Sequence, residues 1–280
     1  AVTRAVLDGA ALGYLDLYLL GDGAAGAGQA EHVWRHVRGA MRKLAAGHET
    51  AAGARVTFGE GCDFSANWFD MAGSNAVVSV TNNAFIRANN EVRFVDGNGT
   101  QLSLDGGTLR AGVIGVANAN NHHLSRTPVL FNGTVVQASR STDVFFELSA
   151  ASAAPLIRDG GAVFDTQGYE VAIRGRGFAQ APGSSGAFVK LGAGTLKVAA
   201  PMTYTGRTAV SNGTLRLDFA LWGGKAGGLL PDAAEVFLAA GPRRAVAGQK
   251  QAAGAGVHRP ALGAVGRGRG GEDTAGGAAG

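Results

Sequence analysis

A short phrase recurs along the chain: two small residues, the second always Gly, then Thr or Ala, then Leu or Val. Its second positions are Gly107, Gly133, Gly161, Gly194 and Gly213, which are 26, 28, 33 and 19 residues apart. Recurrence at intervals of about 20–50 residues is typical of solenoids. We therefore predict a coil in which each turn adds short parallel strands to stacked sheets. In each turn, Gly would form the corner and the following Leu or Val would enter the core.

The segments between these phrases are short runs of β-forming residues. Val77–Val80, Val92–Val95 and Leu102–Leu104 are each followed by Asn, Asp or Gly residues that favour turns. No helical apolar period longer than two turns appears between residues 55 and 238. The fold predicted for 55–238 is an all-β, right-handed parallel β-helix.

Charge and cysteine content exclude several classes of protein. Residues 241–280 hold six Lys or Arg against two acids, which accounts for the whole net charge of +4. The body of the chain is therefore neutral and offers no electrostatic case for nucleic acid. One Cys, Cys62, excludes a disulfide framework and a Cys-based zinc module. The apolar runs are too short to span a bilayer.

Residues 188–217 carry a more specific pattern. They resemble the autotransporter-associated β-strand repeat, which runs Lys-x-Gly-x-Gly-Thr-Leu, then Asn-Thr-Tyr-Thr-Gly-x-Thr-x-Val, then Gly-Thr-Leu-x-Leu. Met202 departs from it, because the family usually has Asn there, and the ladder-forming amide of that turn is therefore missing. The matching residues are Lys190, Gly192, Gly194, Thr195, Leu196, Thr203, Tyr204, Thr205, Gly206, Thr208, Val210, Gly213, Thr214, Leu215 and Leu217.

The resemblance implies a role as well as a fold. It implies a non-catalytic structural rod in a secreted or surface-displayed bacterial protein, at the cell surface or outer membrane. We expect the export signal and the anchor to lie outside residues 1–280. We expect no catalytic residue, no metal site and no cofactor, and we consider cell-surface or extracellular polysaccharide as a partner. The matched residues are then structural.

Residues 1–54 fit this picture less well. Tyr14–Leu20 alternates like a strand, Gly21–Gly26 fits G-x-G-x-x-G, and 30–46 has the apolar spacing of a short helix. Strand, glycine loop and helix is the order that a dinucleotide fold needs, although no further strand–helix units follow. His32 and His36, four residues apart on that helix, could share a metal ion, but an exposed basic helix or out-of-frame sequence is the favoured explanation.

A second hypothesis for this segment is that 28–54 is read out of frame. Residues 30–38 can be written in codons which, read one base later, give Leu-Asn-Met-Ser-Gly-Gly-Thr-Phe, a rung-like phrase. Residues 239–280 also resemble a GC-rich frame read out of phase. Their Gly, Ala and Arg content predicts a disordered tail, because few of the side chains can be buried. The nucleotide sequence of the locus would decide this hypothesis.

Two rival functions place chemistry on the same fold. A polysaccharide-active enzyme would need paired carboxylates, and Asp159 and Asp165 are the candidates, although each also suits a turn. A carbohydrate-binding adhesin would need exposed rings, and Trp68, Phe69 and Trp222 could stack on sugars. Both alternatives stay open at this stage.

Overall fold

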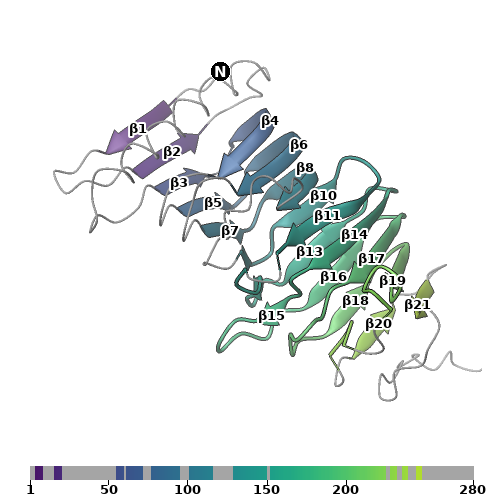
Figure 1. The fold of residues 1–280 in the computed structure, drawn as a ribbon. Coiled ribbons are helices and arrows are strands. Elements are labelled where there is room, and N and C mark those ends of the chain that lie inside the picture. The colour runs from purple at the N-terminus through teal and green to yellow at the C-terminus, as the bar shows by residue number, and fades with distance from the viewer. Residues whose placement is uncertain are drawn as a thin grey trace, which may run out of the picture.

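All regular elements in the described part of the chain are β-strands, stacked along one axis (Figure 1). The structure is a computed structural model. It describes residues 4–8, 16–20, 55–59, 61–71, 77–94, 101–115, 129–149, 152–224, 228–231, 235–238 and 244–247. Its all-β parallel architecture confirms the predicted β-solenoid.

One sheet forms the first face of the coil. Its order is β1-β2-β3-β5-β7-β9-β12-β15, and every neighbouring pair is parallel except β1 and β2. The strands are β1 (Arg4–Asp8), β2 (Asp16–Leu20), β3 (Arg55–Phe58), β5 (Val77–Thr81), β7 (Gln101–Asp105), β9 (Leu130–Phe131), β12 (Leu156–Ile157) and β15 (Ala179–Gln180).

A second sheet of 13 strands supplies the remaining surface. It begins with three long strands that pair in parallel: β4 (Asp63–Met71), β6 (Phe85–Phe94) and β8 (Thr108–Gly115). The first half of β8 pairs with β10 (Val135–Ala138), whereas its end pairs with β11 (Thr142–Leu148). From here each turn of the coil, called a rung below, has two short strands in place of one long one.

Those two series continue side by side. One runs from β10 through β13 (Ala162–Asp165), β16 (Phe188–Leu191), β18 (Thr208–Val210) and β20 (Val236–Leu238). The other runs from β11 through β14 (Glu170–Gly175), β17 (Thr195–Ala199), β19 (Thr214–Leu217) and β21 (Arg244–Ala247). The later rungs therefore present three faces.

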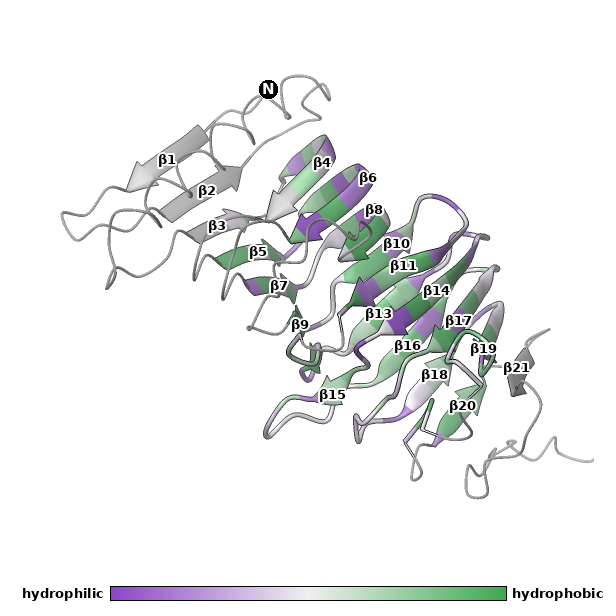
Figure 2. Ribbon diagram, viewed as in Figure 1, coloured by the Kyte–Doolittle hydropathy of each residue, from purple (hydrophilic) through white to green (hydrophobic). Residues whose placement is uncertain are grey.

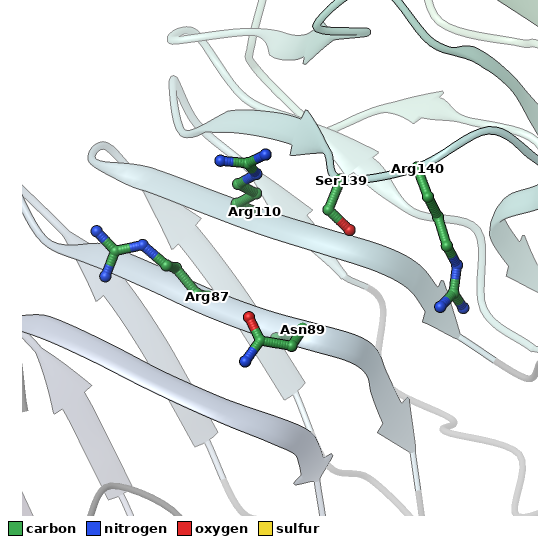
Figure 3. Close-up of a pocket in the computed structure, with 6 residues that line it drawn as sticks. Arg87, Asn89, Arg110, Ser139 and Arg140 are labelled. Carbon is green, nitrogen blue, oxygen red and sulfur yellow. The ribbon is translucent and has the colours of Figure 1, made fainter. Parts of the chain in front are cut away.

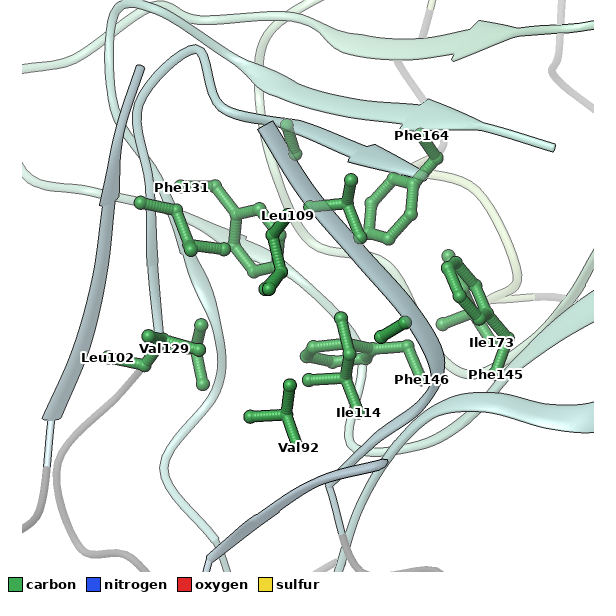
Figure 4. Close-up of a cluster of buried hydrophobic side chains, with 14 of the residues drawn as sticks. Val92, Leu102, Leu109, Ile114, Val129, Phe131, Phe145, Phe146, Phe164 and Ile173 are labelled. Carbon is green, nitrogen blue, oxygen red and sulfur yellow. The ribbon is translucent and has the colours of Figure 1, made fainter. Parts of the chain in front are cut away.

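The core is a column of inward side chains from all three faces. The strands alternate buried and less buried positions, as period-2 geometry requires, and their inward residues are mostly hydrophobic (Figure 2). Aromatic rings meet inside the coil: Phe131 and Phe178 have centroids 5.0 Å apart, and Phe164 and Phe188 5.5 Å. Phe131, Phe146 and Phe164 gather with aliphatic side chains in one buried cluster (Figure 4). This ladder of rings joins one rung to the next.

The repeated glycines lie where the phrase predicts, at the corners. Four of the five have left-handed backbones, with φ values of 68°, 91°, 84° and 68° at Gly107, Gly133, Gly161 and Gly213. Gly194 is needed for another reason, because a Cβ there would overlap the carbonyl oxygen of Tyr169 on the preceding rung. Close stacking, rather than an unusual φ, excludes a side chain at that corner.

Strand pairing extends past both ends of the predicted solenoid. The strand expected at 14–20 is present as β2, which pairs in parallel with β3. At the other end β21 pairs with β19, inside the segment 239–280 for which disorder was expected. Backbone hydrogen bonds to an exposed strand edge need no large side chains, so composition did not reveal this strand.

Several expectations fall outside the described residues: the glycine loop 21–26, the helix 30–46 with His32 and His36, and the rest of the tail. In the described segments, no helix is long and apolar enough to cross a membrane.

Candidate functional site

Lys190 lies at the centre of the rung that carries the repeat. It occupies an inward position of β16 and is 0% exposed, which is rare for a lysine. Its Nζ donates to the carbonyl oxygens of Leu191 at 2.6 Å, Gly192 at 2.8 Å and Asn212 at 3.1 Å. It also lies 3.0 Å from the hydroxyl of Thr166. An ammonium has three N–H groups, so one is shared between two of these four acceptors.

This cluster, called the Lys190 site below, links three rungs. Thr166 follows β13 on the preceding rung, and Asn212 precedes β19 on the next corner. Burial lowers the pKa of Lys190 to about 8, and the charge of Asp165 opposes that shift. The oxygen acceptors around Nζ replace the hydrogen bonds that the ammonium would make with water, and so offset the free-energy cost of burying its charge.

Tyr204 and Thr208 form a second buried polar pair in the repeat. Both are 0% exposed, and the Tyr204 hydroxyl lies 2.6 Å from Thr208 Oγ1. The ring of Tyr204 stacks on Phe188, with centroids 5.6 Å apart and planes 7° from parallel. Burial raises the pKa of Tyr204 to about 12. The pair therefore extends the aromatic ladder and remains neutral at physiological pH.

The turn at Thr205 and Gly206 is held by Gln180 from the preceding rung. Both backbone N–H groups donate to Gln180 Oε1, at 3.2 and 3.1 Å. The amide nitrogen of Gln180 donates onward to the carbonyl oxygen of Ile157 at 2.9 Å. Sequence reasoning missed Gln180, because nothing in a single Gln beside a short strand marks it as a turn anchor.

The two Gly-Thr-Leu phrases of the repeat lie on consecutive rungs. β17 and β19 pair Thr195 with Thr214 and Leu196 with Leu215. Both leucines are buried, and the N–H of Thr214 donates to the carbonyl oxygen of Gly194 at 3.0 Å. The phrase is thus a stacking unit, in which the threonines form the ladder and the leucines fill the core.

Met202, the departure from the family pattern, still serves as an acceptor. Its side chain is 2% exposed, and its sulfur lies 3.4 Å from the backbone nitrogen of Phe178, which donates to it. A thioether is a weak acceptor compared with an amide oxygen. Met202 therefore replaces the amide by a weaker acceptor, and the rest of its side chain is apolar and suits a buried position.

The carboxylates suggested for an enzyme are engaged in turns. Asp159 accepts the N–H of Ser185 at 2.9 Å, on the following rung. Asp165 accepts the N–H of Gln167 at 3.0 Å and an amide hydrogen of Gln137 at 3.4 Å. Asp165 thus caps its own turn, as the sequence allowed, whereas Asp159 bonds to a backbone N–H of the next rung.

The rings and the thiol suggested for binding or catalysis are mostly internal. Phe69 is 1% exposed and packs on Phe58, with centroids 5.5 Å apart, so it cannot stack on a sugar. Trp222 is partly buried against the core, and the Trp68 side chain lies outside the described residues. Burial, with a smaller contribution from Asp63, raises the pKa of Cys62 to about 11, so its thiol is neutral.

Comparison with known protein families supports the assignment of residues 188–217 as a repeat of a known kind. Residues 188–217 match the family described as passenger-associated-transport-repeat. No curated protein and no solved structure shows significant similarity to the chain. The matched residues surround the Lys190 site and the Tyr204 pair, inside a parallel coil. The chain thus carries a passenger-associated transport repeat within a β-solenoid, and together they fit an autotransporter passenger-like β-helix.

Proposed function

We propose that the chain is a non-catalytic structural rod of a secreted or surface-displayed bacterial protein. The observation that carries this proposal is that polar residues of the repeat form hydrogen bonds inside the coil. Lys190, Tyr204 and Thr208 are buried and bonded to neighbouring rungs or to each other. Buried polar groups that bond to neighbouring rungs or to each other support stacking of the coil rather than chemistry on a substrate.

Surface display is proposed from the description of the matched repeat, which associates it with passenger transport. Residues 1–280 would be expressed in a Gram-negative host between the signal peptide and the translocator of a known autotransporter. Antibody labelling of intact cells would then measure how much of an epitope tag reaches the surface. We expect surface labelling and a protease-resistant solenoid.

The matched control is a variant that disrupts one rung of the coil while the signal peptide and the translocator stay unchanged. Leu196→Asp buries a charge in the repeat, so this variant should reach the surface in a protease-sensitive form or in a smaller amount. Retention of the unchanged chain inside the cell, with normal labelling of the host autotransporter, would refute display. Turnover of a glycan by the purified chain would refute the non-catalytic role.

A further inference from the structure

Three arginines line one pocket on the outer surface of the coil. The pocket has a volume of about 340 Å³ and is formed by β6, β8 and the turn after β10. Its lining residues are Arg87, Ala88, Asn89, Arg110, Ser139 and Arg140, called the arginine pocket below (Figure 3). This volume is within the ordinary range for a small-ligand site.

Two of these arginines stand in register on neighbouring strands. Arg87 of β6 pairs with Arg110 of β8 in the parallel ladder. Neighbouring strands lie roughly 4.8 Å apart, and like charges placed directly opposite each other destabilise a sheet. The sheet therefore bears a local repulsion that a bound anion would relieve.

The third arginine approaches from the far side of β8. A Cβ at Gly112 would lie 2.8 Å from Cζ of Arg140, so the guanidinium packs directly over this glycine. Figure 3 shows Arg87 and Arg110 on one side, Arg140 on the other, and Asn89 and Ser139 between them. The absence of a side chain at Gly112 is what allows Arg140 to reach the pocket.

The positive charge is only partly neutralised. Asp63 pairs with Arg87 through two hydrogen bonds, one of them 3.2 Å long, and the Arg87 guanidinium lies 4.0 Å above the Phe85 ring. These contacts fix Arg87 in place. Among the residues that the structure describes, no carboxylate pairs with Arg110 or Arg140. Three arginines and one aspartate leave a formal charge of +2.

We propose that the arginine pocket binds a carboxylate-bearing sugar unit of an acidic polysaccharide. Guanidinium groups present planar, paired donors that match the two oxygens of a carboxylate. Asn89 and Ser139 lie between them and offer neutral partners for the hydroxyl groups of the same sugar. The inference goes beyond the structural role and does not depend on export, because it concerns the purified chain alone.

The rest of the described surface also favours recognition of a charged sugar over a neutral one, because it lacks a stripe of exposed aromatic side chains. Among the side chains that the structure describes, which do not include that of Trp68, Phe237 is the one large hydrophobic that is substantially exposed, at 38%. An aromatic stripe for stacking on neutral sugars is therefore not present there. The arginine pocket, by contrast, selects for charge.

The test is titration calorimetry of the full chain with oligogalacturonate, at about 50 mM and about 200 mM salt. Arg110→Gln and Arg140→Gln each remove one charged donor, and each should weaken binding by about tenfold, a change of about 1.4 kcal/mol. Arg207→Gln is the matched control, since Arg207 is exposed, changes net charge equally and lies outside the pocket. Its affinity should equal that of the unchanged chain.

Arg110→Glu separates loss of binding from loss of folding. It places a carboxylate in register with Arg87, so the sheet should persist while oligogalacturonate binding disappears. A neutral oligosaccharide such as maltohexaose should not bind. The proposal is overturned if oligogalacturonate does not bind, if the Gln variants bind as well as Arg207→Gln does, or if inorganic sulfate or phosphate binds as tightly as the sugar.

Discussion

A buried lysine is uncommon, and Lys190 is tolerated because oxygen atoms from three rungs surround it. Lys197 offers a comparison on the same repeat. Its Nζ lies 2.9 Å from Asp143 and 2.5 Å from Glu170, and both carboxylates are more than half exposed. Lys190 therefore bonds to neutral acceptors in the interior, while Lys197, itself 8% exposed, pairs with two carboxylates that reach the surface.

Replacing these two lysines should have unequal effects. Lys190→Met removes the Nζ donor from the carbonyl oxygens of Gly192 and Asn212 and should lower the free energy of unfolding by about 2–3 kcal/mol. Lys197→Met removes a pair of solvent-screened ion pairs and should cost about 0.5–1 kcal/mol. Urea denaturation of both variants measures the difference. Equal losses would mean that the Lys190 site contributes no more than a surface pair.

The lowered pKa of Lys190 predicts a dependence of stability on pH. The unfolded chain, with a lysine pKa of 10.5, binds more protons than the folded chain above pH 8, so stability rises with pH. Between pH 8 and 9 this contribution of Lys190 to the free energy of unfolding should increase by about 1 kcal/mol. Lys190→Met should show no such increase.

The window between pH 8 and 9 limits the effect of two groups whose contributions to stability have the opposite pH dependence. Cys62 has a pKa raised from 9.0 to about 11, and Tyr204 one raised from 10.0 to about 12. Each raised acid pKa lowers stability as pH rises, and Cys62 offsets roughly a third of the Lys190 gain between pH 8 and 9, because the thiol of the unfolded chain begins to ionise there. A flat profile between pH 8 and 9 in the unchanged chain would contradict the assignment to Lys190.

At the scale of elements, the positions of the corners were predictable from the sequence, but the reason that each corner requires glycine was only partly so. The spacing of Gly107, Gly133, Gly161 and Gly213 predicted corners, and their left-handed backbones confirm them. The same spacing could not show that Gly194 is required by contact with Tyr169 of another rung. The register between rungs, which creates that contact, is a tertiary property that a recurring phrase does not specify.

Substitutions at Gly168 and Gly194, on consecutive rungs, separate the effect of backbone conformation from that of close contact. Gly168 has a φ of 91° and open space where a Cβ would lie, so Gly168→Ala should cost about 1 kcal/mol from backbone strain alone. Gly194→Ala would force apart two rungs and should cost about 3 kcal/mol. Thermal unfolding compares them. A smaller loss at Gly194 would show that the corner can relax.

The paired arginines predict a gain in stability from a charge change. Arg110→Glu replaces a like-charge neighbour of Arg87 by an opposite one, and should raise the free energy of unfolding by about 0.5 kcal/mol at low salt. About 1 M salt should remove most of the gain, because the Debye length falls to roughly 3 Å. Denaturant titrations at both salt concentrations test this. A loss of stability at low salt would show that the Arg87–Arg110 pair is not repulsive.

For the whole molecule, the β-solenoid was predictable from periodicity, whereas the location of a binding surface was not. Arg87, Arg110 and Arg140 are 23 and 30 residues apart in sequence and carry no motif. Only the parallel stacking of β6, β8 and the turn after β10 brings them to one pocket. Coiling converts residues one rung apart into neighbours, and the exact rung lengths decide which ones meet.

Damage to one rung should remain local. Leu215 is buried on β19, near the C-terminal end of the described coil, so Leu215→Asp should loosen the adjacent rungs and leave earlier ones folded. Limited proteolysis should then cut near β19 while a core containing β10 to β14 survives. Hydrogen exchange along the chain checks the same pattern. Uniform loss of protection would show that the coil unfolds as a single unit.

The parallel stacking also determines how the coil responds to force. Hydrogen bonds between rungs run along the stacking axis, while the strands lie across it. Tension along the axis therefore loads the bonds of one rung at a time, so the coil should peel open in steps at low force. Lys190, which bonds to three rungs at once, ties adjacent steps together. The passenger-like repeat would thus be the place where peeling pauses.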